Sequence, residues 1–434
     1  MDYLIRSALS VNGTIRVAPD KSISHRAFMF GALATGMTTI NNFLWADDTE
    51  ATLDGLRALG VNIPQVEPEV NTLTIIGHGF DALKKPQTEL NCGNSGTSMR
   101  LLAGILAGRP WASTLVGDAS LNKRPMDRVQ QPLSLMGAQI DGQGARCTPP
   151  LSIRGGNLQG IEYRLPVASA QVKSAILLAG LQAQGTTAVI EPTPTRDHTE
   201  RMLKAFGVPV HQEQGRISVN ADYPLIAPQA PIEVPGDISS AAYFLVAAAL
   251  RPGWQVTVTN VGINTTRTGI LDVLQAMGAT ISLDNQHTSG DEPIADVTVQ
   301  GAPLHAAEIG GAIIPRLIDE LPVLALLATQ AEGQTVIRDA AELRNKESDR
   351  IAIITTELRK LGAQIEETTD GMIITGPTKL TGTTVTSPRG DHRIAMTLAV
   401  AGLIAEGTTV IENAEATTSS FPGFLVRLSD VAQR

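Results

Sequence analysis

The chain has 434 residues, of which 43% are hydrophobic, 18% charged and 3% aromatic, and its formal net charge is −9. This length exceeds that of one ordinary domain, and the hydrophobic content excludes a disordered or fibrous protein and predicts a globular, multi-domain one. The acidic balance and the scarcity of aromatic side chains argue against nucleic acid as a partner.

The sequence carries no signal for export, membrane insertion or metal binding. Its first segment, MDYLIRSALSVNG, lacks the long apolar core of a signal peptide, and apolar runs elsewhere are shorter than the ~20 residues of a membrane helix. Cys92 and Cys147 have no CxxC partner and no flanking histidines, which argues against a zinc site or a disulfide framework. We therefore expect a soluble cytoplasmic protein that needs no metal.

In chain order, six segments rich in Ala, Leu and Gly have no polar face, so they are predicted to be interior helices. They cover residues 24–34, 97–107, 171–181, 239–250, 320–328 and 392–405. A Thr- and Val-rich strand follows each of them and begins near a glycine, at positions 36, 108, 185, 253, 333 and 407. The spacing, about 72 residues or one sixth of the chain, predicts six repeated units.

A second helix with a solvent face completes five of the six units. It ends on a glycine in the segments LRALGVNI, LSLMGAQI, LKAFGVPV, LQAMGATI and LRKLGAQI. Buried helix, strand, exposed helix and further strands predict an α/β protein. A solenoid is the alternative, but its repeats are typically about 20–45 residues long. Two globular domains of three units fit better, with a boundary near Val234–Pro235–Gly236 at the end of a proline-rich stretch and with residues 1 to 18 joined to the C-terminal half.

Cations accompany the first turns of the predicted interior helices, although a positive charge there opposes the helix dipole. They are Lys21, Arg26, Arg100, Lys173, Arg389 and Arg393. The loops after the strands add Arg124, Arg128, Arg196, Arg344, Lys346 and Arg350. A bound polyanion would supply the compensating charge, since helix N-termini and cations bind anions together. For any single position, simple capping or surface charge is the alternative.

Two carboxylates stand out among these cations. Asp319 begins an otherwise apolar helix, whereas Glu347 lies between Lys346 and Arg350, so their different surroundings could divide acid and base roles between them. His392 is a further candidate proton carrier. The alternative is that Asp319 caps its helix and Glu347 neutralises its neighbours. No P-loop, dinucleotide fingerprint, Ser-His-Asp order or HExxH motif is present, which favours chemistry without metal or nucleotide.

The chain resembles the 5-enolpyruvylshikimate-3-phosphate synthase family over all 434 residues, and seven motifs of the branch called class II carry the resemblance. They are DKSISHRA, GNSGTSMR, KRPMDRV, ASAQVKSA, TRDHTERM, NKESDRI and GDHRIAM. The resemblance implies an α/β fold of two similar domains, each of three βαβαββ units arranged as an inside-out α/β barrel. The domains would comprise residues 19–236 and residues 1–18 plus 237–434, with the active site in the cleft between them.

The resemblance also implies an activity. The enolpyruvyl group of phosphoenolpyruvate would be transferred to the 5-hydroxyl of shikimate 3-phosphate through a tetrahedral intermediate, with release of phosphate. The reaction belongs to the shikimate pathway of aromatic amino-acid biosynthesis. It needs no cofactor, and the expected form is a monomer whose partners are these two substrates.

Site residues follow from the matching motif positions. Shikimate 3-phosphate would be bound by Lys21, Ser22, Arg26, Ser169, Gln171, Arg196, Asp319 and Lys346. Phosphoenolpyruvate would be bound by Lys21, Asn94, Gly96, Thr97, Arg124, Gln171, Arg350 and Arg393. The catalytic residues would be Lys21, Asp319, Glu347 and His392, with Glu347 moving a proton to and from the methylene carbon and Asp391 lining the same pocket. Which carboxylate takes the proton of the 5-hydroxyl is left open.

The chain departs from the family pattern at two positions. Ala170 stands where some members have a second serine, and Ser419 lies in the segment where some have a lysine that reaches phosphoenolpyruvate. Gly96 keeps the small residue that leaves room for the inhibitor glyphosate, so measurable but weakened inhibition is expected.

Two other functions compete with this assignment. The sister enzyme that transfers enolpyruvyl to UDP-N-acetylglucosamine typically has a cysteine in the segment corresponding to residues 120–128, and this chain has none there. A non-catalytic repeat protein that sequesters a phosphorylated metabolite would gain nothing from Glu347 among its cations.

Overall fold

The computed structural model describes residues 2–65 and 70–433, and the chain divides into two compact units. Unit 1 comprises Met1–Ala18, Pro235–Thr288 and Pro293–Arg434. Unit 2 comprises Pro19–Val234 together with Ser289–Glu292. Each unit therefore has its own core, and both units are discontinuous in sequence.

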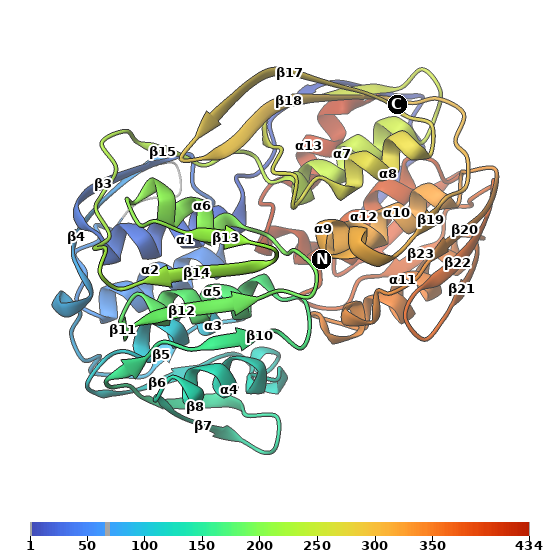
Figure 1. The fold of residues 1–434 in the computed structure, drawn as a ribbon. Coiled ribbons are helices and arrows are strands. Elements are labelled where there is room, and N and C mark those ends of the chain that lie inside the picture. Colours follow the sequence, from blue (N-terminus) through green and yellow to red (C-terminus); the bar gives the residue numbers. More distant parts are fainter. Residues whose placement is uncertain (1, 66–69, 434) are drawn as a thin grey trace. The chain divides into compact units, whose positions relative to one another are not determined.

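Unit 2 contains three small sheets built on one plan, in which the strand after a buried helix pairs with one parallel and one antiparallel neighbour (Figure 1). Their strand orders are β15-β3-β4, β5-β6-β8-β7 and β10-β12-β14-β13, beside a short pair β11-β9. The strands are β3 (Thr35–Asn41), β4 (Thr72–His78), β5 (Leu90–Asn91), β6 (Ala112–Val116), β7 (Gln139–Gln143), β8 (Thr148–Arg154), β9 (Leu158–Gln159), β10 (Glu162–Arg164), β11 (Ala183–Gln184), β12 (Thr186–Ile190), β13 (His211–Glu213), β14 (Arg216–Asn220) and β15 (Ile232–Glu233).

Unit 1 repeats the plan in the sheets β17-β18-β16-β2-β25, β19-β20-β22-β21 and β1-β24-β23. Its strands are β1 (Tyr3–Arg6), β2 (Ser10–Ile15), β16 (Gln255–Gly262), β17 (Thr280–Ser289), β18 (Glu292–Gln300), β19 (Glu308–Ile309), β20 (Gly333–Ile337), β21 (Gln364–Glu367), β22 (Met372–Gly376), β23 (Thr384–Thr386), β24 (Thr408–Glu412) and β25 (Ala432–Gln433). The strands β1 and β2 pair with β24 and β16, so the N-terminal segment belongs to sheets of unit 1. The mixed α/β class expected from the sequence is confirmed.

Six buried helices form the centres of the two units, as predicted. They are α1 (Lys21–Leu33), α3 (Gly96–Leu106) and α5 (Ala170–Gly180) in unit 2, and α7 (Ile238–Ala249), α10 (Leu321–Ala328) and α12 (His392–Gly402) in unit 1. In unit 2, α3 packs against α1 and α5, and in unit 1 the three helices pack against one another. Because these segments lack a polar face, only their N-terminal turns carry charged groups.

The second helix of each repeat keeps one exposed face. These helices are α2 (Asp47–Ala58), α4 (Asp127–Leu135), α6 (His198–Ala205), α8 (Gly269–Ala276), α11 (Arg350–Lys360) and α13 (Phe424–Val431). Five of them are followed by the predicted glycine, at positions 60, 137, 207, 278 and 362, with φ between 82° and 113°. A left-handed residue after a helix favours glycine, which explains the repeated helix-Gly-strand pattern.

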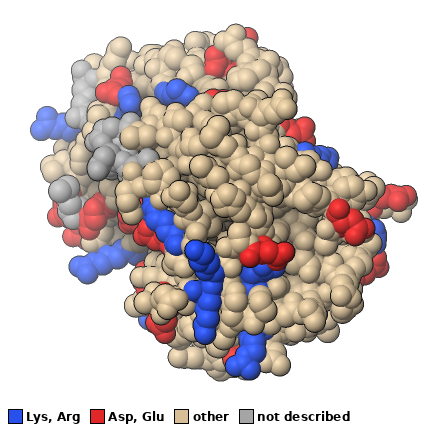
Figure 2. All heavy atoms as spheres, turned by 90° about the vertical axis from the view of Figure 1, so that its left-hand side faces the viewer, with Lys and Arg blue, Asp and Glu red and all other residues tan. Residues whose placement is uncertain are grey.

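The surface carries charges of both signs. On the face drawn in Figure 2, the described Lys and Arg side chains are interspersed with Asp and Glu over a largely uncharged surface. Among the described residues, no helix is both long and apolar enough to cross a bilayer.

Candidate active site

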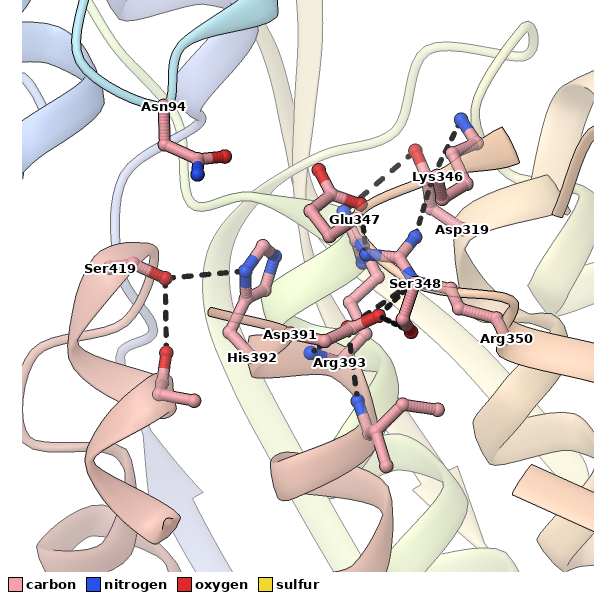
Figure 3. A network of polar contacts seen from close by, with 12 residues as sticks. Asn94, Asp319, Lys346, Glu347, Ser348, Arg350, Asp391, His392, Arg393 and Ser419 are labelled. Carbon is pink, nitrogen blue, oxygen red and sulfur yellow. Dashed lines mark hydrogen bonds and ion pairs between the residues drawn. The ribbon is translucent and has the colours of Figure 1, made fainter. Parts of the chain in front are cut away.

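The main cluster of charged side chains in unit 1 forms around Arg350, the first residue of α11 (Figure 3). Its guanidinium lies 3.0 Å from Asp391 Oδ2, 2.6 Å from Glu347 Oε2 and 3.5 Å from Asp319 Oδ1. These carboxylates come from the N-cap of α12, the loop before α11, and the short 3-10 turn η4 (Ile318–Glu320) that precedes α10. Residues far apart in the sequence therefore meet where three helices begin.

Arg350 is buried, and its charge is maintained by its neighbours. Burial alone would lower the pKa of Arg350, but Asp391 and Glu347 outweigh it, so the pKa is raised and the group stays protonated. Asp391 is also fully buried, accepts the backbone N–H groups of Arg393 and Ile394, and accepts the hydroxyl of Ser348 at 2.6 Å. Arg350 and Asp391 thus each have further polar partners besides one another. Their ion pair holds the start of α12 against the start of α11.

Asp319 lies among cations rather than in the apolar surroundings expected from the sequence, and that expectation is wrong. Its carboxylate lies 3.3 Å from Lys346 Nζ and 3.8 Å from Arg393 Nη2, in addition to its contact with Arg350. The cause is local: the chain makes a 3-10 turn at Ile318–Glu320, and Glu320 rather than Asp319 precedes the first turn of α10. Both candidate acid–base groups, Asp319 and Glu347, therefore contact the same guanidinium.

His392 begins α12 and is buried beside Ser419. The Ser419 hydroxyl lies 3.3 Å from His392 Nδ1, and it belongs to the 3-10 helix η6 (Ala414–Ser419) (Figure 3). At the position where some members of the resembling family have a lysine, this chain therefore places a hydroxyl next to the candidate proton carrier.

Unit 2 has its own buried cation at the start of α1. Arg26 donates to the hydroxyl of Thr199 at 2.7 Å, to that of Ser174 at 2.8 Å and to the Ser22 carbonyl at 2.9 Å. Burial lowers the pKa of Arg26 to about 10, although the nearby Glu200 opposes the shift. Arg26 remains charged at neutral pH while its donors contact neutral oxygens.

The loop before α3 connects the other predicted residues of unit 2. Asn94 Oδ1 accepts from Arg124 at 2.5 Å, and Gln171 Nε2 donates to Thr97 Oγ1 at 2.9 Å. Next to them, a Cβ built on Gly96 would lie 2.7 Å from Arg100 Nη1. The structure thus brings Asn94, Gly96, Thr97, Arg124 and Gln171 together at one helix N-terminus.

Polar residues cap the buried helices of unit 2. Asp20 and Ser95 cap α1 and α3, accepting the N–H groups of Ile23 and Ser98. Ser169 caps α5. Lys21 instead forms an ion pair with Asp48 at 2.9 Å, and the half-buried Arg196 lies in the loop before α6.

Comparison with known proteins assigns the chain to a family. The sequence profile described as EPSP synthase (3-phosphoshikimate 1-carboxyvinyltransferase) matches residues 5–428. The chain belongs to this family. A curated relative named 3-phosphoshikimate 1-carboxyvinyltransferase from Bacillus subtilis strain 168 is 53% identical over 425 residues, with 98% of each chain covered. The enzyme of that name from Brevibacillus brevis is 54% identical over 428 residues, covering 98% of this chain and 99% of the relative.

The fold agrees with the family. A solved structure of EPSP synthase from Acinetobacter baumannii superimposes with a TM-score of 0.88 at 46% identity, covering 99% of this chain and 98% of the other. The resemblance and fold predicted from the seven motifs are confirmed. The sequence left three functions open. Membership of the EPSP synthase family favours enolpyruvyl transfer to shikimate 3-phosphate over transfer to UDP-N-acetylglucosamine and over non-catalytic binding of a phosphorylated metabolite.

Not every cation predicted to accompany the helix starts faces a ligand site. Lys173 in α5 is fully buried between Glu200 at 2.7 Å and Glu191 at 3.0 Å, so its expected role in compensating a bound polyanion is wrong. Burial would lower the pKa of Lys173, but the two carboxylates outweigh it and raise the pKa. Arg344 is likewise occupied locally, by Asp349 at 2.8 Å.

Sequence reasoning missed several supporting groups. They are Asp48, Ser174, Thr199, Glu200 and Ser348. Thr199 and Glu200 lie within the motif TRDHTERM, where two polar residues in the first turn of a helix were the available signal. Among the described residues, no group of three or more His, Cys, Asp and Glu side chains is arranged to hold a metal ion.

Proposed function

We propose that this member of the EPSP synthase family transfers the enolpyruvyl group of phosphoenolpyruvate to the 5-hydroxyl of shikimate 3-phosphate, and that the side chains described above perform the reaction. The observation that carries the proposal is the family match over residues 5–428, which includes both clusters. Asp319, Glu347 and the cations around them supply the groups that such a transfer requires.

Binding is the first task of the site, because both substrates are anions and repel each other. In unit 2, Arg26 with Ser22, Ser169, Gln171 and Arg196 would hold shikimate 3-phosphate. Hydrogen bonds to neutral hydroxyls orient the Arg26 guanidinium without neutralising it, which favours a phosphate as its charged partner.

Phosphoenolpyruvate would bind the loop at Asn94, Gly96 and Thr97 together with Arg124, because that loop leads into the first turn of α3, and helix N-termini attract anions. Lys21, Gln171, Arg350 and Arg393 complete the expected set. Fixing both substrates in this way supplies positioning and electrostatic stabilisation, the main contributions available without a cofactor.

Proton transfer is the second task. In the addition step, the methylene carbon of phosphoenolpyruvate gains a proton, while the substrate 5-hydroxyl oxygen bonds to the adjacent carbon and loses its own proton. In the elimination step, the carbon–oxygen bond to phosphate breaks and the new methyl group loses a proton. Glu347 would move the proton at the methyl carbon, since its carboxylate is 24% exposed and is oriented by Arg350 at 2.6 Å.

Asp319 would contact the shikimate hydroxyls. Its ion pairs with Lys346 and Arg350 fix the position of the carboxylate within the cluster. Asp319 and Glu347 both pair with the Arg350 guanidinium and are the two carboxylates that would accept the proton of the 5-hydroxyl. His392, held by Ser419, would assist at the same pocket.

The direct experiment measures phosphate release from phosphoenolpyruvate. Release should require shikimate 3-phosphate and should not occur when UDP-N-acetylglucosamine is offered instead. Release that depends on the nucleotide sugar would overturn the proposal, as would absence of release with either acceptor.

Replacing Glu347 by Gln tests the acid–base role. Turnover should fall by about 10²–10⁴-fold, the usual contribution of a positioned general acid or base. Calorimetric binding of shikimate 3-phosphate should survive. Glu367→Gln, in strand β21 of the same unit, is the matched control and should keep full activity.

Phosphoenolpyruvate ligands are expected in both units, so the proposal requires both units to engage the substrates. Small-angle X-ray scattering with and without shikimate 3-phosphate tests this requirement, since closure around a charged ligand would reduce the radius of gyration. An identical radius in both conditions would count against a shared site.

A further inference from the structure

A chain of buried hydrogen bonds runs through the interior of unit 2 to the cap of α3. His25 Nδ1 lies 2.7 Å from Thr52 Oγ1, which lies 2.6 Å from Ser98 Oγ, which lies 2.7 Å from Ser95 Oγ. All four side chains are at most 1% exposed. The chain connects α1, α2 and α3 and ends at the residue between Asn94 and Gly96.

The contacts at the far end of this chain fit one direction of its protons. Ser98 has a single hydroxyl proton, and its acceptors are Ser95 Oγ and the Asp48 carbonyl at 3.3 Å. A carbonyl cannot donate, and when the Ser98 proton is directed to this side, Ser98 Oγ accepts from Thr52. Thr52 has one proton, so in this arrangement its oxygen accepts from His25.

The near end of the chain gives the same answer. His25 Nε2 is buried and has no hydrogen-bond partner among the described residues. A neutral imidazole carries its proton on one nitrogen only, and a buried N–H without an acceptor is rarer than an unpaired acceptor. The proton therefore belongs on Nδ1. Burial, with Lys21 and Arg26 nearby, lowers the pKa of His25 to about 3 against the pull of Asp48, so the ring is neutral.

We propose that His25 is a positioning residue: as the Nδ1–H tautomer it begins a one-way relay through Thr52 and Ser98 that fixes Ser95 and the loop Asn94–Thr97. The inference rests on the proposed function in one respect, namely that this loop binds phosphoenolpyruvate. His25 touches no substrate. Its effect reaches the loop only through hydroxyl groups, so what matters is a donor at the Nδ1 position rather than an imidazole.

Nuclear magnetic resonance of the protein with ¹⁵N-labelled histidine tests the relay directly. The sequence has seven histidines, and the His25 signals are those lost in the His25→Asn variant. At pH 7 they should show a neutral ring protonated at Nδ1. A ring protonated at Nε2, or a doubly protonated ring, would overturn the proposal. The measurement uses the unmodified protein without substrate, so it stands whatever the variants do.

Two substitutions distinguish the effect of a donor at the Nδ1 position of residue 25 from the effect of the imidazole ring itself. In His25→Asn the side-chain NH₂ occupies the place of Nδ1, whereas in His25→Gln it reaches the place of Nε2. The Asn variant should keep the KM for phosphoenolpyruvate within about twofold. The Gln variant should raise that KM by about tenfold, as expected for one lost hydrogen bond, with the KM for shikimate 3-phosphate unchanged. Equal KM values in the two variants would refute the relay.

Thr52→Val removes the middle of the chain with little change of shape. In that background the Asn and Gln substitutions at position 25 should become equivalent, both in KM and in thermal stability, because the relay no longer reaches Ser95. A difference that persists would show that His25 acts by another route. Thermal stability and the tautomer of His25 are measured without any enzymatic reaction. They therefore still test the relay if no phosphate is released and the proposed function is wrong.

Discussion

Two buried arginines, Arg350 in unit 1 and Arg26 in unit 2, are held in opposite ways. In unit 1, Arg350 contacts three carboxylates, from Asp319, Glu347 and Asp391. In unit 2, Arg26 contacts two hydroxyl groups and a backbone carbonyl. Arg350 begins α11 and Arg26 lies in the second turn of α1, and both residues are at most 3% exposed.

This difference suggests that the two units, although built on one α/β plan, have different tasks in the reaction. A guanidinium surrounded by carboxylates is already neutralised, so its main effect is to orient those acids for proton transfer. A guanidinium held by neutral oxygens keeps its charge for an incoming anion. We infer that unit 1 contributes mainly the acid–base groups and unit 2 mainly the binding of shikimate 3-phosphate.

The largest effect should come from removing a carboxylate around Arg350. Asp391→Asn keeps a good helix cap but leaves the buried guanidinium without its fully buried counter-ion, which should destabilise the protein by about 3–5 kcal/mol. Urea unfolding monitored by circular dichroism measures the loss. Ser348→Ala removes only the neutral partner of Asp391 and should cost far less. Equal losses in the two variants would show that the charge on Asp391 is unimportant.

The neutral character of the unit 2 network predicts a dependence of stability on pH. The pKa of His25 is about 3 in the folded chain against 6.5 as the reference value. Below pH 6.5 the unfolded chain therefore binds a proton that the folded chain excludes, and stability falls as pH falls. Between pH 7 and pH 5 the loss attributable to His25 is about 2 kcal/mol.

The His25→Asn variant should lack this part of the loss. Urea unfolding of both proteins at pH 7 and pH 5 gives the difference, in which the carboxylate contributions cancel. His211→Asn, at an exposed position in β13, controls for the loss of a histidine as such. If the wild type and the His25→Asn variant lose stability in parallel, His25 is not held neutral by the fold.

The sequence was sufficient for the repeated helices and for the family, but not for how the charges of the candidate residues are paired. A segment that is apolar on all sides is recognised as an interior helix, such as α5, without knowledge of the elements that pack against it. This pattern does not reveal that Lys173 pairs with Glu191 and Glu200, because Glu191 follows strand β12 and Glu200 belongs to helix α6. Asp319 was misjudged for a similar reason: the 3-10 turn that aims it at Lys346 depends on backbone geometry that periodicity does not encode.

A smaller effect should follow from removing one neutral oxygen that holds Arg26. Thr199→Val replaces the acceptor of Arg26 Nε with a methyl group of similar shape and leaves a buried donor unsatisfied. Affinity for shikimate 3-phosphate should fall by roughly tenfold, corresponding to a cost within about 1–3 kcal/mol, while the KM for phosphoenolpyruvate changes little. Thr199→Ser keeps the hydroxyl and should restore affinity. Loss of phosphoenolpyruvate binding instead would contradict the assignment of Arg26.

The smallest effect concerns Gly96, which lies in the loop before α3, next to Arg100 and Arg124. A Cβ at this position would lie 2.7 Å from Arg100 Nη1 and 3.6 Å from Arg124 Nη1. The close atom is the end of a flexible side chain, so the chain can accommodate Gly96→Ala by moving Arg100, and thermal stability should change little. Arg100 also donates to Gln171 at 2.6 Å, so this movement would disturb an expected phosphoenolpyruvate ligand. Steady-state kinetics should therefore show a KM for phosphoenolpyruvate raised by several-fold at constant KM for shikimate 3-phosphate. A variant with both KM values unchanged would show that Arg100 moves independently of the loop, and the loop would then be less tightly coupled to its cations than the contacts indicate.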